Sequence, residues 1–123
     1  INTEKLGYYG HSWGARLGAI IPAVESRLKV SILVVGGLPS SSRIPEADEL
    51  NYLPYVKIPV LMLNGKYDMA FPYETTVKPF FELLGTQSKD KHIRIYETDH
   101  YVPKNEMIKE VLSFLDNYLG HVK

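Results

Sequence analysis

The sequence predicts an α/β fold, a three-layer arrangement with a mostly parallel sheet of about four strands flanked by helices. The first observation is the order of the segments, because short apolar runs alternate with helical patterns four times along the chain. The second is that most of these runs are apolar throughout, as expected where helices cover both faces of a parallel sheet. No repeat or linker divides the chain, so residues 1–123 are expected to form one domain.

The first two strands and the helix between them have the clearest signals. Residues 6–9 predict a strand that is too apolar for an exposed edge, so we expect it to be central in the sheet. A helix begins at Trp13, and Pro22 is expected to kink it or to end its first part near Ile21. The β-branched run Val30–Val35 predicts a second, buried strand.

The rest of the chain continues the alternation. Proline and serine mark a loop, further apolar runs mark strands, and two amphipathic patterns mark helices. The predicted elements are a loop at 38–48, a short helix within 47–56, strands at 58–64 and 92–96, a helix opening at 71–76 and stopping at Gly85, and a last helix at 105–119 capped by Gly120.

Composition excludes several classes of function. Lys plus Arg and Asp plus Glu both number 14, so no net charge favours nucleic acid or an anionic membrane surface. The absence of cysteine excludes disulfides and thiolate metal sites, and no histidine or carboxylate pair has ligand spacing on one face. No apolar run approaches the roughly 20 residues of a membrane span. We therefore expect no cofactor, no metal and no membrane partner, and take the cytoplasm as the default location.

The segment Gly10-His11-Ser12-Trp13-Gly14 is the most informative stretch. It places Ser12 between the first predicted strand and the helix after it, with glycine two positions away on each side. A serine in such a turn has an exposed hydroxyl and lies at the N-terminus of the new helix, which is the geometry of a nucleophile elbow. The flanking glycines are expected to let strand and helix pass closely.

A serine nucleophile needs a base, and the base needs a carboxylate that orients it. Asp68 follows the third predicted strand and His100 the fourth, so both side chains are expected at the same sheet edge as Ser12. Each has a simpler interpretation as an ordinary turn or loop residue. Asp48, after the second strand, is the main rival of Asp68 for the acid role.

These segments together resemble the C-terminal half of an α/β-hydrolase. The resemblance rests on the elbow at 10–14, the turn at 64–68 with Phe71-Pro72 after it, and the loop at 99–103 before the last helix. The sequences of these segments are most similar to those of the dienelactone hydrolase and prolyl-oligopeptidase-like branch, including hydrolase domains attached to some bacterial serine/threonine kinases. Asp99 departs from that pattern, since many members have glycine before the histidine.

The resemblance implies a serine hydrolase that acts on an ester, lactone or peptide bond. Ser12 would be the nucleophile, Asp68 the acid and His100 the base, and the Trp13 amide would be one donor of the oxyanion hole. No segment here matches the second donor, so weak activity is expected from this chain, which also lacks an initial methionine and is interpreted as a fragment.

The alternative is an inactive hydrolase-like half that serves as an interaction or oligomerisation module. Nothing before the strand at 6–9 would cover its edge, and an uncovered edge favours pairing with a second copy. The sequence thus predicts a homo-oligomer formed through this edge.

Overall fold

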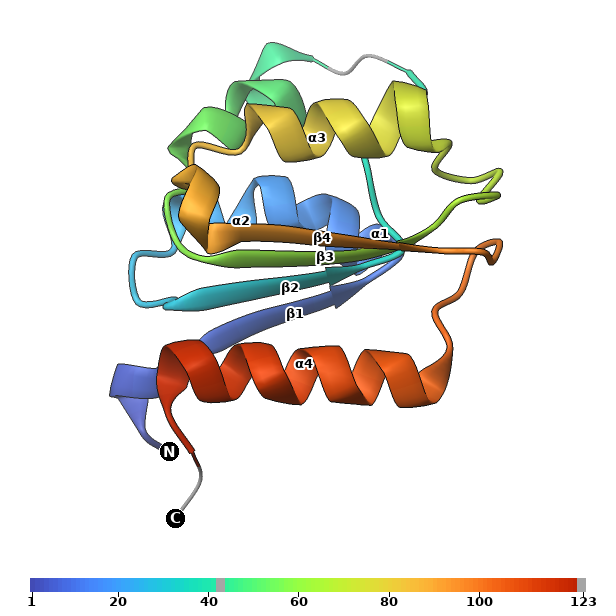
Figure 1. Ribbon diagram of the computed structural model, residues 1–123. Helices are drawn as coiled ribbons and strands as arrows, with labels where there is room; N and C mark the ends of the chain where they lie inside the picture. Colours follow the sequence, from blue (N-terminus) through green and yellow to red (C-terminus); the bar gives the residue numbers. More distant parts are fainter. Residues whose placement is uncertain (42–43, 122–123) are drawn as a thin grey trace.

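A computed structural model, which describes residues 1–41 and 44–121, contains one four-stranded sheet (Figure 1). All neighbouring strands are parallel, and their spatial order equals their order in the chain. The predicted fold class is therefore confirmed. Residues 42 and 43, within the predicted loop, lie outside the described residues. The strands are β1 (Gly7–His11), β2 (Val30–Val34), β3 (Val60–Gly65) and β4 (Lys91–Tyr96).

Helices cover both faces of the sheet. Helices α1 (Trp13–Arg16), α2 (Ile21–Val24) and α3 (Lys78–Leu83) lie on one face, and α4 (Lys104–Leu119) crosses the other (Figure 1). Successive strand side chains point to opposite faces, so β2 and β3 contribute to two separate cores and every residue in both strands is buried. This explains why their sequences are apolar without alternation.

The helical segment after β1 is broken, as Pro22 predicted. Helix α1 has only four residues, a 3-10 turn follows at Leu17–Ala19, and α2 starts with Pro22 in its first turn. A proline there costs little because the first amides of a helix have no intrahelical acceptor.

Two predicted helices differ from the structure. The region 47–56 forms 3-10 turns, with Pro45 and Pro54 each in the first turn of one, rather than one short helix. The helix after β3 begins with a π-helical turn at Tyr73–Val77, and α3 ends at Leu83. Gly85 has another role, because a Cβ there would lie 2.8 Å from the Pro54 carbonyl carbon.

Strand β1 is the other difference. It was expected to be central, but within the described residues it pairs only with β2 and forms one edge of the sheet. Tyr9 is 52% exposed, whereas Tyr8 packs into the core on the α1 face. Within the described residues, β1 therefore packs through one face, against α1, and through one edge, against β2.

Candidate active site

Ser12 occupies a strained turn between β1 and α1. Its backbone has φ 56° and ψ −111°, a conformation that non-glycine residues rarely adopt. The turn is held by the Ser12 amide, which donates to the Val34 carbonyl at 2.8 Å, and by the Ser12 carbonyl, which accepts from the Arg16 amide at 3.0 Å. These two bonds direct the chain sharply from β1 into α1.

The two flanking glycines are not equivalent. A Cβ on Gly10 would lie 2.6 Å from the Ala15 amide nitrogen and even closer to the Gly14 carbonyl, so the strand and helix touch at Gly10. A Cβ on Gly14 would meet nothing within 4 Å. The expected need for a small residue therefore holds at position 10 and fails at position 14.

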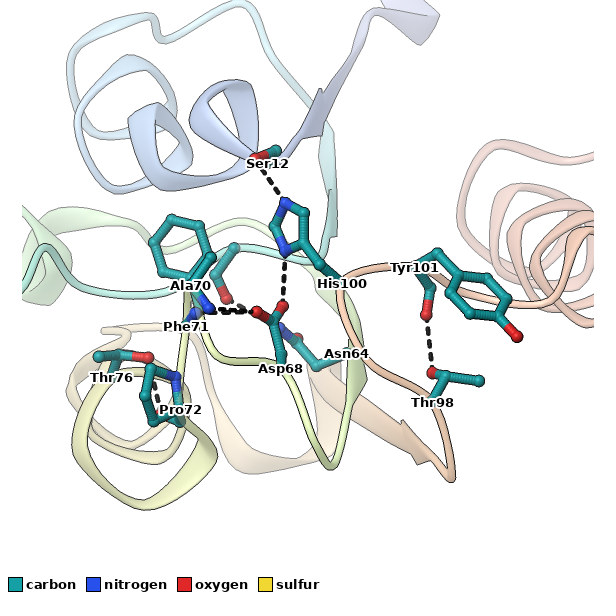
Figure 2. Close-up of polar contacts among 11 residues, drawn as sticks. Ser12, Asn64, Asp68, Ala70, Phe71, Pro72, Thr76, Thr98, His100 and Tyr101 are labelled. Carbon is teal, nitrogen blue, oxygen red and sulfur yellow. Dashed lines mark hydrogen bonds and ion pairs between the residues drawn. The ribbon is translucent and has the colours of Figure 1, made fainter.

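Asp68 lies in the turn after β3 and is 2% exposed. Its Oδ1 atom accepts hydrogen bonds from the amides of Ala70 (2.8 Å) and Phe71 (3.0 Å), and its Oδ2 atom lies 2.7 Å from Nδ1 of His100 (Figure 2). A buried carboxylate is tolerated only with such partners. The turn therefore aims one oxygen of Asp68 at the histidine and ties down the other.

His100, in the loop between β4 and α4, connects the other two residues. Its Nε2 atom lies 2.9 Å from Oγ of Ser12 (Figure 2). When Nδ1 carries the proton and donates a hydrogen bond to Asp68, Nε2 has a lone pair that can accept a hydrogen bond from the Ser12 hydroxyl. The structure thus brings Ser12, His100 and Asp68 into one chain of hydrogen bonds.

Two aromatic rings pack against the imidazole. Phe71 stacks on His100 with ring centroids 6.0 Å apart and planes 25° apart, and His11 meets it nearly edge-on at 6.4 Å. The His100 side chain is still 36% exposed. Its ring is therefore oriented by neighbours while remaining open to a substrate.

The other predicted residues lie elsewhere or have different contacts. Asp48, the rival acid, accepts a hydrogen bond from the Leu50 amide at 3.0 Å and caps a turn. Asp99, the departure from the family pattern, is exposed. Trp13 is 67% exposed and begins α1, so its amide is among the first-turn amides that lack an intrahelical acceptor.

The sequence analysis missed one ion pair that supports the elbow. Arg16, one turn after Ser12, donates from Nε to Oε1 of Glu49 at 2.5 Å. Glu49 is 1% exposed, and its Oε2 atom has no partner among the described residues. The pair joins α1 to the turns at 45–55. A buried glutamate in a polar loop carries no sequence signal of its own.

The amides of Ala70 and Phe71 were also missed, although a signal existed. An aspartate commonly accepts from amides two and three residues later, so Asp68 itself predicts that turn.

Within residues 1–41 and 44–121, no cluster of three metal-ligating side chains occurs and no helix is long and apolar enough to span a membrane.

Comparisons with known proteins agree with the fold. No protein-family model and no curated protein matches the sequence. Among solved structures, a cold-adapted esterase from an Arctic intertidal metagenomic library is 27% identical with a TM-score of 0.77, covering 94% of this chain and 50% of its own. The α/β hydrolase GrgF from Penicillium sp. sh18 is 13% identical with a TM-score of 0.84, covering 98% of this chain and 66% of its own.

A candidate dienelactone hydrolase from Klebsiella pneumoniae is 22% identical with a TM-score of 0.74, covering 89% of this chain and 51% of its own. The chain thus spans about half the length of the esterase and of the Klebsiella pneumoniae protein. Its sheet, flanking helices and structural neighbours agree, and the chain is a partial α/β-hydrolase in fold.

Proposed function

We propose that this chain carries the catalytic residues of a serine hydrolase. The observation that supports the proposal is the unbroken sequence of hydrogen bonds from Ser12 Oγ to His100 Nε2 and from His100 Nδ1 to Asp68 Oδ2. This arrangement lets His100 accept the serine proton while buried Asp68 stabilises the imidazolium.

The proposed reaction proceeds through an acyl-enzyme. Ser12 Oγ bonds to the substrate carbonyl carbon as its proton moves to Nε2 of His100, and the carbonyl oxygen becomes an oxyanion near the Trp13 amide. The C–O or C–N bond of the substrate then breaks, and His100 returns the proton to the leaving group. Water, deprotonated by His100, cleaves the ester on Ser12 and restores the free hydroxyl.

The substrate class is an ester, a lactone or a peptide bond, and esters are favoured because the 27% identical neighbour is an esterase. The donor proposed for the oxyanion is the Trp13 amide, which begins α1. An oxyanion hole with a single donor lowers rates by about 10²–10³-fold, so we expect this chain to be slow on its own.

An activated ester tests the proposal. The chain is incubated with p-nitrophenyl acetate, and the release of p-nitrophenol and the mass of each peptide are followed. One acetyl group per chain is expected on the peptide that contains Ser12, and Ser12→Ala abolishes it. A Ser12 peptide without an acetyl group in wild type, or with as much acetyl in Ser12→Ala as in wild type, would contradict the assignment.

The second candidate function is an oligomerisation module, favoured by the outer edge of β1. The Ser12 amide donates to β2, and backbone groups alternate in direction along a strand, so the groups of Gly7, Tyr9 and His11 point away from β2. Beside this edge Tyr9 contacts Met107 of α4, with 3.7 Å between oxygen and sulfur. We propose that a second copy pairs with this edge, because its outward backbone groups have no partner strand among the described residues and such groups favour strand addition.

A further inference from the structure

Strand β3 ends in direct contact with the loop that carries His100. A Cβ placed on Gly65, the last residue of β3, would lie 2.6 Å from the Thr98 carbonyl oxygen and closer still to that of Asp99. Both obstacles are backbone atoms, which no side-chain rotation can remove. Residues 98 and 99 therefore reach their positions only because residue 65 has no side chain.

Backbone hydrogen bonds continue this contact beyond the strands. The Lys66 amide donates to the Tyr96 carbonyl at 2.8 Å, and the Tyr67 amide donates to the Thr98 carbonyl at 2.9 Å. The Tyr67 hydroxyl also donates to Oε2 of Glu97 at 2.8 Å. The turn after β3 and the loop after β4 are thus attached to each other along their length.

This attachment lies between the two residues whose separation matters for the chemistry. The Gly65 carbonyl accepts from the Asp68 amide at 3.3 Å, which starts the acid turn. On the other side, Asp99 directly precedes His100. The contact at Gly65 therefore sets the relative positions of both ends of the 2.7 Å bond between Asp68 and His100.

We propose that Gly65 is a positioning residue for His100. The inference rests on the proposed function, in which His100 is the base. By allowing the backbone of residues 98 and 99 to lie against β3, Gly65 holds the imidazole over Asp68 and so keeps the proton on Nδ1. Gly65 acts through His100 and touches neither the substrate nor Ser12.

Alanine at position 65 is expected to break this arrangement. The loop must retreat, and a displacement of about 1 Å at a catalytic group is enough to cost on the order of 10²-fold in rate. Once Nδ1 leaves Asp68, nothing at that nitrogen selects the Nδ1–H tautomer, because the tautomer is set by the hydrogen bond the ring makes. The share of the Nε2–H tautomer should rise.

The imidazole nitrogens report this directly without any activity. Nitrogen-15 NMR of histidine-labelled chain, with His100 assigned by loss of its signals in His100→Gln, measures the tautomer in wild type, Gly65→Ala and Gly14→Ala. Gly14→Ala is the matched control because position 14 has open space for a Cβ. Wild type and Gly14→Ala are expected to show the Nδ1–H form, and Gly65→Ala a mixture or the Nε2–H form.

Each outcome decides a different point. A folded Gly65→Ala with the wild-type tautomer would overturn the inference and leave the proposed function standing. A wild-type His100 in the Nε2–H form would remove both. If Gly65→Ala does not fold, Tyr67→Phe takes its place, because the exposed Tyr67 hydroxyl belongs to the same attachment; an Nε2–H share larger than wild type is expected, and an unchanged tautomer overturns the inference.

Discussion

Ser12 combines an exposed function with an unfavourable backbone. A non-glycine residue at φ 56° and ψ −111° costs on the order of 1–3 kcal/mol, which the rest of the fold must offset. Two hydrogen bonds hold the turn in place, one from the Ser12 amide to the Val34 carbonyl and one from the Arg16 amide to the Ser12 carbonyl. The strain is localised at the residue whose hydroxyl is proposed to react.

This strain predicts a difference in stability between two substitutions at position 12. Ser12→Gly should be more stable than Ser12→Ala by about 1 kcal/mol, because glycine relieves the φ strain even after its greater unfolded-state entropy is counted. Urea unfolding of both variants measures the difference. Equal stability, or a more stable alanine variant, would show that the turn at Ser12 is unstrained.

Glu97 offers a test of the surface contact beside the site. The pKa of Glu97 is lowered, first by the hydrogen bond from Tyr67 and then by the charge of Lys66. Tyr67→Phe should therefore raise the pKa of Glu97 towards its ordinary value, whereas Tyr55→Phe, at another exposed tyrosine, should leave it unchanged. A lowered folded pKa gives stability above the ordinary carboxyl pKa that is lost as the pH falls through the lowered value. Carbon-13 NMR titration measures the pKa of Glu97. If this pKa is the same in Tyr67→Phe as in wild type, the hydrogen bond from Tyr67 is contradicted.

At the scale of elements, α1 is too short to hold its own orientation. It has four residues, and isolated helices of that length are unstable, so its direction depends on the contact at Gly10 and on the pair of Arg16 with Glu49. Gly10 and Glu49 are buried, and the residues of the two contacts that lie nearest in the chain, Gly10 and Arg16, are within four positions of Ser12. The position of the serine is therefore a property of the tertiary contacts around α1.

The Arg16–Glu49 pair predicts a large, recoverable loss of stability. Arg16→Met leaves the buried Glu49 carboxylate without a partner, which costs about 3–5 kcal/mol, whereas Arg16→Met with Glu49→Leu should recover most of this loss. Thermal and urea unfolding compare the two with wild type. A single variant as stable as the double variant would show that the carboxylate is not buried as described.

The sequence was informative where a pattern is local and failed where packing decides. Trp13 opened the helix as predicted and Pro22 interrupted it, because capping and proline effects act within one turn. The 47–56 region and the end of α3 differ because Pro45, Pro54 and the close approach at Gly85 act through the backbone and tertiary contacts. Glu49 could not be placed from sequence since its partner is 33 residues away.

At the scale of the whole molecule, parallel order alone predicts where the site lies. Ser12, Asp68 and His100 follow three strands that run in the same direction, so all three lie at the carboxyl ends of the strands. Strand order was not predictable: the apolar residues of β1 suggested a central strand, yet β1 has one neighbour among the described residues. Distances between side chains, such as the stacking of Phe71 on His100, required the structure.

The edge of β1 that pairs with no strand in the described part of the chain predicts self-association. Sedimentation at micromolar concentration is expected to show a dimer or larger assembly that Tyr9→Pro dissociates, because proline removes an outward amide without removing a bond to β2. Tyr9→Thr, which keeps the amide, is the matched control and should still associate. A monomeric wild type, or a Tyr9→Pro variant that associates as strongly as Tyr9→Thr, would contradict pairing through β1.

His100 is proposed to activate the Ser12 hydroxyl, and covalent labelling of Ser12 measures this activation. A fluorophosphonate is added to wild type and to His100→Ala, and the labelled peptide is identified by mass spectrometry as its formation is timed. We predict one label, on Ser12, that forms in wild type and is nearly abolished in His100→Ala. A label on another residue, or equal rates in the two proteins, would contradict the claim.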